Sequence, residues 1–300
     1  ESLPPLRTAR TGAAVVALAD GARLVVGGAG SENAGAEWLP ASAQPARVLK
    51  LDLSAEDIIG QFADGRMLAL RSDDRVEAIT LSKATGAPVL ERTQLAPLEL
   101  RRRSGQGGKV VVKGLADGRI IVAGGEEQPY TIALLDESSM ESDAPDRYVG
   151  AGDFGPAHSY QIYDPARRSW HASAPSPTAG GQVVVLDDGR VLKLAAGAIE
   201  ASSASGDAWR PFESKQGLRV RLDGEARLFA IQGELFVSGA GPGMPSGDGA
   251  GVLQWFDGAR RQWVTLWQAD PKSNWRDNVG RILARTLANG KRVVIPVEGF

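Results

Sequence analysis

A short unit recurs along the chain and limits the fold more than any other feature of the sequence. In its clearest copy, Leu115–Glu127, a turn at Asp117-Gly118 precedes the apolar run Ile120–Ala123, which ends at Gly124-Gly125. Asp-Gly favours a two-residue type I′ turn, because both central residues of that turn need positive φ. The apolar run predicts a strand buried on both faces, and the paired glycines indicate a bend or a close approach to another backbone.

The other copies of this unit lie at residues 17–30, 62–73, 186–197, 230–241 and 287–299. The copy at 230–241 is the weakest match, since Gln232 replaces the aspartate of the turn. The turn glycines of the six copies are Gly21, Gly65, Gly118, Gly189, Gly233 and Gly290. Their spacings are 44, 53, 71, 44 and 57 residues, so the unit recurs with insertions of uneven length.

A second unit follows some of these copies. Ser159–Pro175 reads as a strand, an Asp-Pro turn and a second strand that opens on Trp170, and Leu253–Trp267 repeats this order with Trp263. The segment Gly206–Phe212 keeps only the tryptophan. Two hairpins in each repeat give about four strands in roughly 50 residues, a length typical of propeller blades.

The order of these signals resembles the kelch family of β-propellers, and the match spans almost the whole chain. The kelch pattern has an arginine-led inner strand, a turn, a strand ending in Gly-Gly, a Tyr-Asp-Pro strand and a tryptophan-led outer strand. The matching residues here are Arg10, Asp20-Gly21, Gly27-Gly28, Tyr163-Asp164-Pro165 and Trp170. No single short match is specific, but their recurrence in a fixed order is.

The resemblance implies an all-β fold, a kelch-like β-propeller of about six four-stranded blades, with five and seven as the alternatives. The last unit, from about Asn274, has only an inner hairpin before Phe300. We therefore expect the N-terminal segment Glu1–Leu6 to close the last blade in part by supplying a strand. Residues 1–300 are expected to form a single β-propeller domain, either complete or part of a longer natural chain.

Composition excludes several functional classes. The net charge of −2 and the pI near 5.9 argue against nucleic acid or an anionic membrane as the main partner. The sequence has no apolar run of membrane-spanning length, which predicts no membrane span. The chain has no cysteine, so disulfides and thiolate metal sites are excluded. Some kelch-like oxidases use a copper site with a cysteine crosslinked to a tyrosine, and that chemistry is excluded too. We predict no metal and no cofactor.

Arginines at the expected starts of inner strands are the first candidates for ligand binding. In the kelch pattern this arginine leads the strand that lines the central channel. The candidates are Arg10, Arg103, Arg219, Arg221 and Arg281. A ring of guanidinium groups at one channel mouth would suit a carboxylate or phosphate, as in an acidic sugar or a peptide carboxylate. The alternative is that each arginine bridges adjacent blades through carboxylates and backbone carbonyls.

The aromatic residues divide into two groups. Trp170, Trp263 and Trp209 fit the outer-strand position and are predicted to pack between blades. Trp275 is less constrained by the repeat, and among the tryptophans it is the best candidate for ligand contact. We interpret the acidic segment 135–155 and the glycine-rich segment 239–251 as loops. The two histidines, His158 and His171, have no partner motif, so no catalytic residue is assigned.

Two hypotheses for function remain. The favoured one is a non-catalytic kelch-like propeller that binds a protein or carbohydrate ligand through one face of the ring. Its specificity would lie mainly in loops at 31–45, 136–156 and 239–251. The alternative is a cofactor-free sugar-converting enzyme that resembles sialic-acid mutarotases, with an arginine and carboxylate site at the central channel. Such an enzyme needs a carboxylate and at least two arginines at one channel mouth. We expect a monomeric bacterial domain, with a periplasmic or extracellular location favoured.

Overall fold

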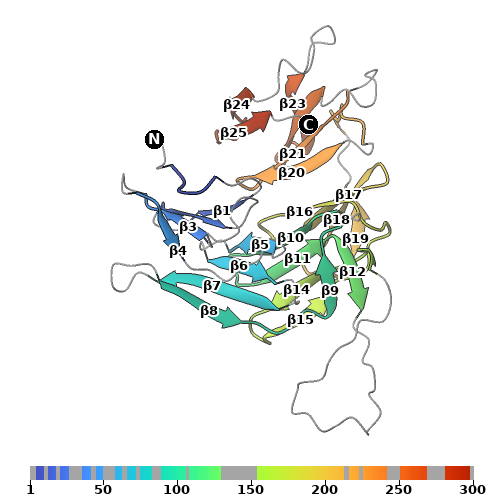
Figure 1. Cartoon of the computed structure of the whole chain (residues 1–300). Helices are drawn as coiled ribbons and strands as arrows, with labels where there is room; N and C mark the ends of the chain where they lie inside the picture. Colours follow the sequence, from blue (N-terminus) through green and yellow to red (C-terminus); the bar gives the residue numbers. More distant parts are fainter. Residues whose placement is uncertain are drawn as a thin grey trace, which may run out of the picture.

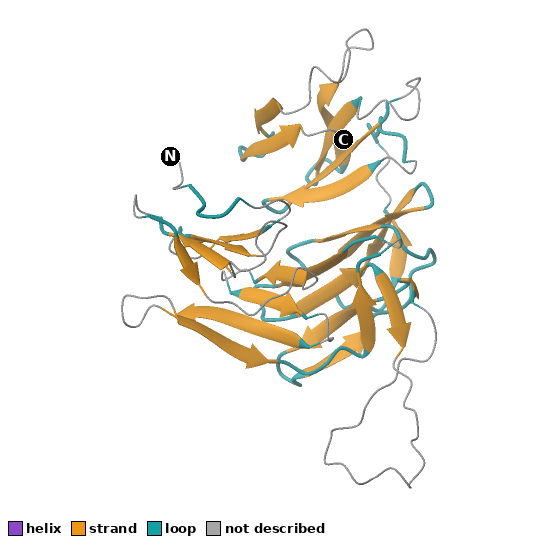
Figure 2. Ribbon diagram, in the orientation of Figure 1, coloured by secondary structure: helices purple, strands orange, loops and turns teal. Residues whose placement is uncertain are grey.

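The computed structural model shows an all-β chain (Figures 1 and 2). It describes residues 5–9, 13–17, 21–26, 36–41, 45–49, 58–62, 66–71, 75–82, 89–105, 108–129, 154–212, 216–222, 226–241, 251–268 and 281–297. These residues form strands, turns and loops, and none of them is helical. The described part of the chain accordingly contains no helix able to cross a membrane.

Five blades each contain four strands. Blade 1 consists of β1 (Ala14–Ala17), β2 (Arg23–Val26), β3 (Ala36–Leu39) and β4 (Arg47–Leu49). Blade 2 consists of β5 (Ile58–Gln61), β6 (Met67–Leu70), β7 (Val76–Ser82) and β8 (Val89–Gln94). Blade 3 consists of β10 (Val110–Gly114), β11 (Ile120–Gly124), β14 (Tyr160–Asp164) and β15 (Ser169–Ala172). The segment expected to be a loop at 31–45 therefore contains a buried strand, β3.

Blades 4 and 5 and the last blade follow in chain order. Blade 4 consists of β16 (Gln182–Val185), β17 (Val191–Ala195), β18 (Ala198–Ser202) and β19 (Trp209–Pro211). Blade 5 consists of β20 (Arg227–Ile231), β21 (Glu234–Gly239), β22 (Val252–Asp257) and β23 (Gln262–Gln268). Within the described residues, the last blade comprises the hairpin of β24 (Arg281–Thr286) and β25 (Arg292–Val297). This is a propeller of about six blades, as the repeat predicts.

Each blade is an antiparallel meander, and this fixes two faces of the ring. The turns from first to second strand and from third to fourth strand lie at one end, which we call the turn face. The connections from second to third strand, and the connectors that lead into the next blade, lie at the other end, which we call the connector face. The first strands of blades 2 and 3 also pair in parallel, at Gln61 and Lys113. Gly60 permits this approach, because a Cβ there would lie 2.2 Å from the Val112 carbonyl oxygen.

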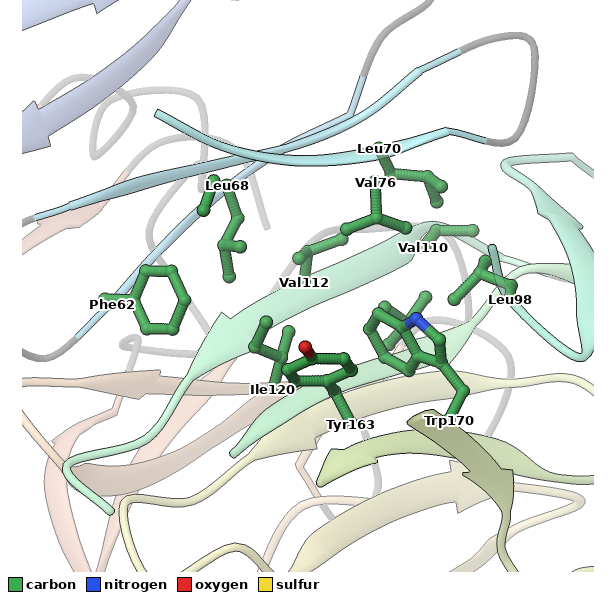
Figure 3. Packing of buried hydrophobic residues seen from close by; sticks show 12 residues of the cluster. Phe62, Leu68, Leu70, Val76, Leu98, Val110, Val112, Ile120, Tyr163 and Trp170 are labelled. Carbon is green, nitrogen blue, oxygen red and sulfur yellow. The ribbon is translucent and has the colours of Figure 1, made fainter. Parts of the chain in front are cut away.

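The core is a series of apolar clusters between successive blades. Figure 3 shows the cluster of blades 2 and 3, in which Leu68 and Val76 meet Val112, Ile120 and Trp170. Similar clusters join blades 1 and 2, 3 and 4, 4 and 5, and blade 5 with the last blade. The interpretation of three tryptophans as core residues agrees with this packing, since Trp170 and Trp263 are buried and Trp209 is partly buried in such clusters.

The clearest copy of the repeated unit, Leu115–Glu127, forms the predicted strand but not the predicted turn. β11 is buried along its whole length. Gly118 has a φ of 87°, but Asp117 does not have positive φ, so a type I′ turn is excluded. The Leu115 carbonyl instead accepts a hydrogen bond from Gly118 N at 3.1 Å, which gives a three-residue loop with glycine in the left-handed position. The Asp117 side chain favours this geometry, because it accepts hydrogen bonds from Arg119 N and Nε at 3.0 and 2.7 Å.

The weakest copy of the unit has the turn that was expected of the others. Gln232 and Gly233 have φ values of 54° and 78°, so both central residues have the positive φ that a type I′ turn requires. Gly124 also meets its prediction, with a φ of 77° and a would-be Cβ only 2.6 Å from the Lys109 carbonyl oxygen. The equivalent prediction for Gly27 falls outside the described residues.

A polar side chain on the third strand binds the connector into the same blade. Gln161 of β14 accepts hydrogen bonds from the backbone N–H groups of Glu99 and Leu100 at 2.7 and 3.0 Å. Gln254 of β22 binds the connector into blade 5 in the same way, through Arg219 N and Val220 N. These contacts pair backbone donors that would otherwise be unsatisfied between blades.

An indole on the fourth strand binds the connectors into blades 3 and 4. Trp170 Nε1 donates to the Ala96 carbonyl at 2.7 Å, and Trp209 Nε1 donates to the Ala174 carbonyl at 2.9 Å. In blade 3, a hydrogen-bonding tryptophan and a hydrogen-bonding glutamine therefore hold the same connector. Both positions are buried for structural reasons, in agreement with the predicted core role of the tryptophans.

The N-terminal segment behaves like a connector into blade 1. Glu37 of β3 accepts hydrogen bonds from Arg7 N at 2.6 Å and Thr8 N at 3.1 Å. Residues 5–9 form no strand. They therefore do not supply the N-terminal strand that was predicted to close the last blade, and residues 1–4 lie outside the described residues.

Candidate ligand-binding site

A three-stranded sheet stands apart from the blades on the connector face beside blade 3. It consists of β9 (Leu100–Arg103), β12 (Glu126–Pro129) and β13 (Gly155–Pro156), in the order β13-β12-β9. β12 continues from β11 directly after Gly125, and β13 precedes β14. The sequence predicted an insertion near Asp136–Pro156 but not this sheet, whose strands frame that insertion. The sheet places side chains on a face where propellers commonly bind ligands.

Arg103 is the most accessible cation of this sheet. Its Nε donates to Glu126 Oε2 at 2.8 Å, and its guanidinium carbon lies 4.0 Å from the centroid of the Phe154 ring. The side chain is nevertheless 57% exposed, and within the described residues its two terminal amino groups have no partner. Arg101 also faces Phe154, at 5.5 Å. The guanidinium of Arg103 is thus held in place, and no described residue occupies the two outer donors that would suit an anion.

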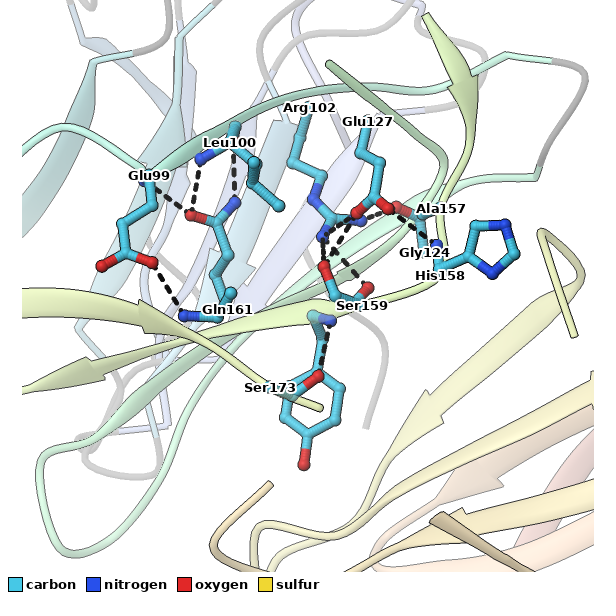
Figure 4. A network of polar contacts seen from close by, with 12 residues as sticks. Glu99, Leu100, Arg102, Gly124, Glu127, Ala157, His158, Ser159, Gln161 and Ser173 are labelled. Atoms are coloured by element: carbon cyan, nitrogen blue, oxygen red, sulfur yellow. Dashed lines mark hydrogen bonds and ion pairs between the residues drawn. The ribbon is translucent and has the colours of Figure 1, made fainter. Parts of the chain in front are cut away.

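Arg102 lies on the opposite face of β9, because neighbouring strand residues point to opposite sides. Its side chain is 0% exposed. Its Nη2 lies 2.8 Å from Glu127 Oε2, and its Nη1 donates to the Gly124 carbonyl at 3.2 Å. Nη2 also donates to the carbonyl and the hydroxyl of Ser159, both at 3.0 Å (Figure 4). Burial lowers the pKa of Arg102, and the charge of Glu127 opposes that shift.

Glu127 is engaged by protein donors at both carboxylate oxygens. Oε1 accepts a hydrogen bond from His158 N at 3.0 Å, and Oε2 accepts one from Ser159 Oγ at 2.8 Å, as Figure 4 shows. Together with Arg102, these contacts connect β9 and β12 to the start of β14. The Arg102–Glu127 pair therefore supports the sheet and leaves the outward face to Arg101 and Arg103.

A second buried cation lies in blade 4, beneath this network. Lys193 of β17 is 3% exposed, and its Nζ donates to the Ala157 carbonyl and to Ser176 Oγ, both at 3.1 Å. Glu200 of β18 accepts hydrogen bonds from Ser176 Oγ at 2.8 Å and from Thr178 Oγ1 at 3.0 Å. Burial lowers the pKa of Lys193 to about 8, with Glu200 and Glu127 opposing the shift and Arg102 adding to it. This cluster binds the connector into blade 4.

The structure places three of the predicted arginines on connectors. Arg103 ends β9 and does not begin an inner strand, because the inner strand β10 starts at Val110. Arg219 is exposed, and its backbone N–H is bound by Gln254. Arg221 is half-buried, and its backbone N–H donates to the Ala240 carbonyl at 2.9 Å. All three lie at the connector face, but Arg103 belongs to blade 3 and the other two to blade 5.

The other predicted site residues are less informative. Arg281 begins β24. Arg10 and Trp275 lie outside the described residues. A ring of these arginines at one channel mouth therefore stays a prediction.

Sequence reasoning missed Arg102, although a signal for it exists. Residues 3–10 read LPPLRTAR and residues 95–102 read LAPLELRR, so the two connectors align without a gap and Arg10 matches Arg102. The hydrogen bonds agree with this alignment, since Glu37 binds Arg7 and Thr8 where Gln161 binds Glu99 and Leu100. The alignment therefore places Arg102 at the arginine position that the two connectors share. Arg103 has no counterpart in that alignment and belongs to the β9–β12–β13 sheet of blade 3.

Comparison with known proteins finds similarity to solved structures only. No family model and no curated protein matches the chain. The chain is similar in structure to a fungal alcohol oxidase of the AA5 family in complex with copper, with 17% identity and a TM-score of 0.49. The similarity covers 98% of this chain and 60% of the oxidase, so the chain spans less than two thirds of that protein. A mutant of puromycin hydrolase complexed with PGG is similar at 14% identity and a TM-score of 0.43, over 91% of this chain and 39% of the hydrolase.

The residues of this chain do not fit the copper centre of a cysteine-dependent oxidase. The sequence contains no cysteine. Within the described ranges, no group of at least three His, Cys, Asp or Glu side chains could hold a metal ion. The description of the molecule as an all-β propeller of about six blades rests on its own strand topology.

Proposed function

We propose that this chain is a non-catalytic, kelch-like propeller that binds a protein or carbohydrate ligand through the connector face of the ring. One observation carries the proposal: Arg103 is fixed by Glu126 and Phe154 while its terminal amino groups have no partner among the described residues. A guanidinium held in one orientation loses little freedom on binding and matches the geometry of a carboxylate. The ligand therefore carries a carboxylate, as in an acidic sugar or an acidic peptide.

Phe154 supplies the apolar part of the same site. The ring lies between Arg101 and Arg103, at 5.5 and 4.0 Å from the two guanidinium carbons, and it is half-buried. An aromatic ring beside a guanidinium suits the apolar face of a sugar ring or an apolar peptide side chain. The second-to-third connections of blades 1, 3 and 5 leave from this face, so their loops would add specificity. We also propose that residues 1–300 act as one domain, since apolar clusters link each blade to the next.

Calorimetric titration with a panel of neutral and acidic monosaccharides and short acidic peptides tests this function. We expect at least one acidic ligand to bind, and Arg103→Met to weaken its affinity by about tenfold or more, which corresponds to about 1.4 kcal/mol. Arg167→Met is the matched control, because Arg167 is 80% exposed but lies in a turn on the opposite face. Equal affinity in wild type and Arg103→Met, or binding of neutral ligands alone, would contradict the proposal.

A second candidate function is a cofactor-free sugar-converting enzyme that resembles sialic-acid mutarotases. It is favoured by Arg101, Arg103 and Glu126, which lie on one face of two paired strands, while Arg102 and Glu127 lie on the opposite face. A carboxylate beside arginines is sufficient for proton transfer during anomer interconversion. An argument against this candidate is that both carboxylate oxygens of Glu127 already bind protein groups, from Arg102, His158 and Ser159. Exchange spectroscopy of an acidic sugar should show catalysis that Glu126→Gln abolishes; the uncatalysed rate in wild type would remove this candidate.

A further inference from the structure

The linker between β13 and β14 connects the proposed ligand site to the body of the propeller. It consists of residues 157–159, which follow Phe154 and β13 and lead into β14. The linker forms no strand, yet Ala157 is only 3% exposed. Backbone groups that are buried outside a sheet need hydrogen-bond partners of another kind. The groups that hold this linker therefore help to fix the position of Phe154.

Side chains of the β9–β12–β13 sheet hold the linker from blade 3 (Figure 4). Glu127 accepts a hydrogen bond from His158 N at 3.0 Å, and Arg102 Nη2 donates to the Ser159 carbonyl at 3.0 Å. The carbonyls of Ala157 and His158 have their partners in blade 4 and in the connector that leads into it. The linker is therefore held from two blades.

The contacts from the blade 4 side come from the backbone and from one side chain. Ser176 N on the connector donates to the His158 carbonyl at 2.7 Å, and Gly180 N donates to the Ala157 carbonyl at 3.0 Å. The Ala157 carbonyl also accepts a hydrogen bond from Nζ of Lys193, at 3.1 Å. Lys193 thus reaches the linker from β17, across the boundary between the two blades.

The ammonium group of Lys193 is fixed in position by its own partners. An ammonium has three N–H donors, and those of Lys193 meet the Ala157 carbonyl, Ser176 Oγ and the Thr178 carbonyl. The residue is buried, and the negative charge of Glu200 stabilises the ammonium. Because the group is buried and its donors are engaged, Lys193 acts on the ligand site through the linker and not by contact with a ligand.

On the basis of the function proposed above, we propose that Lys193 is a positioning residue of the ligand site. From blade 4 it fixes the 157–159 linker, and through the linker the Phe154 ring that lies 4.0 Å from the guanidinium carbon of Arg103. Without the lysine, the Ala157 carbonyl loses its charged donor, and the short strand β13 depends more on its pairing with β12. The ligand must then order Phe154 when it binds, which lowers its affinity.

A variant that loses the lysine contact but keeps blade 4 stable separates positioning from folding. Lys193→Val, Glu200→Gln and Ser176→Leu in one chain replace the buried polar cluster by the residue types that blade 3 has at the same positions. Both charges of the cluster are removed together, so neither is left buried without the other. The backbone N–H of Ser176 stays in place, so of the contacts to the linker only that of Lys193 is lost.

Lys113→Met is the matched control. Lys113 also joins blades 3 and 4, because its Nζ donates to the Val185 carbonyl at 2.9 Å and to Asp187 at 2.6 Å. It does so at the turn face, on the side of the ring opposite to the linker. The control therefore removes a lysine contact between the same two blades without touching the ligand site.

Hydrogen exchange followed by mass spectrometry, on the protein without ligand, tests whether Lys193 fixes the linker. We expect the triple variant to exchange the amides of residues 154–159 about tenfold faster than wild type or more, with little change elsewhere in blades 3 and 4. Titration with the acidic ligand that wild type binds then tests the site, and we expect the triple variant to lose about tenfold in affinity or more. Lys113→Met should match wild type in both measurements.

Wild-type exchange at 154–159 in a folded triple variant would overturn the proposal, and so would faster exchange spread evenly over blades 3 and 4. Faster exchange at 154–159 with unchanged affinity would show that the linker does not position the site. If no acidic ligand binds wild type, the proposed function fails by itself, and the exchange result still decides whether Lys193 fixes the segment that carries Phe154. If the triple variant does not fold, Lys193→Met takes its place in both measurements.

Discussion

Blades 3 and 4 bind their connectors at the same place with different chemistry. In blade 3 the third-strand residue is Gln161, its partner on the second strand is Val122, and the connector contributes Leu98, which is 2% exposed. In blade 4 the corresponding positions hold Glu200, Lys193 and Ser176. The connectors are aligned by their tryptophans, since Trp170 binds Ala96 and Trp209 binds Ala174.

The comparison shows three positions changing together. A neutral amide beside two aliphatic side chains becomes a carboxylate with a buried lysine and a hydroxyl. A buried lysine is costly unless charge and hydrogen-bond partners compensate for lost water, and Glu200 and Ser176 supply them. The repeat therefore specifies a hydrogen-bonding residue at this position of the third strand. Whether that residue is neutral, as Gln161, or charged, as Glu200, depends on its neighbours in space.

The largest effect is expected when the lysine alone is removed. Lys193→Val should lower the free energy of unfolding by about 3–5 kcal/mol, because the Ala157 and Thr178 carbonyls lose their buried donor and Glu200 loses the attraction of the lysine charge. Converting all three positions to the blade 3 residues, Lys193→Val with Glu200→Gln and Ser176→Leu, should recover most of that loss. Denaturant unfolding of the single and triple variants measures both values. A triple variant no more stable than Lys193→Val would show that the three positions do not compensate for one another.

A smaller effect is expected in blade 3. Gln161→Leu should cost about 1–3 kcal/mol, because the N–H groups of Glu99 and Leu100 and the Leu100 carbonyl lose their partner. Gln161→Glu keeps the acceptor but adds a charge without a lysine beside it, so it should also destabilise. Denaturant unfolding at neutral pH compares the two variants with wild type. If Gln161→Glu were as stable as wild type, the role given to Lys193 in blade 4 would be wrong.

The lysine also predicts a dependence on pH. Its pKa in the folded protein is about 8, below the ordinary value of 10.5, so between these values the unfolded state binds more protons. Stability from this residue should therefore rise with pH, by at most about 1.4 kcal/mol per pH unit, and be lost as pH falls through 8. The difference in unfolding free energy between wild type and Lys193→Val, followed from pH 7 to 10, isolates this contribution. A difference that shrinks as pH rises would contradict the assigned direction.

The smallest effects should be the same in both blades. Asp117 and Asp188 lie in exposed turns and bind Arg119 and Arg190 through the same two hydrogen bonds. Asp117→Ala and Asp188→Ala should each cost about 0.5–1 kcal/mol, since each removes a turn hydrogen bond and a solvent-exposed ion pair. Thermal unfolding of both variants checks this. A clear inequality would mean that the difference between the blades extends to their turns.

Much of the fold could be predicted from local signals. Five of the six turn glycines have positive φ, and the sixth, Gly65, lies outside the described residues. These turns, the strands that follow them and the tryptophans of the outer strands follow from residue types at short spacing. The turn type was wrong for Asp117-Gly118, because the Asp117 side chain bonds Arg119 and favours a longer loop. The β9–β12–β13 sheet was not predicted, because its short strands pair across an insertion and carry mostly charged or polar residues.

The candidate site was predicted only in part. Arg103 was named from its place in the sequence, but its availability depends on Glu126 and Phe154, which are distant along the chain. Arg102 was missed because nothing local distinguishes it from its neighbours. Only the strand alternation of β9 buries one of these arginines and exposes the other.

The sequence by itself determined the repeat, and with it the blade order, the turn positions and the tryptophans between blades. These features follow from backbone preferences and hydrophobic patterning within some 50 residues. Only the tertiary structure decided which polar residues are buried and which cation stays available to a ligand. Burial and charge compensation depend on residues that meet across blades. Lys193 of blade 4 donates to the Ala157 carbonyl, which precedes β14 of blade 3. Arg103, in contrast, has Phe154 on one side and solvent on the other.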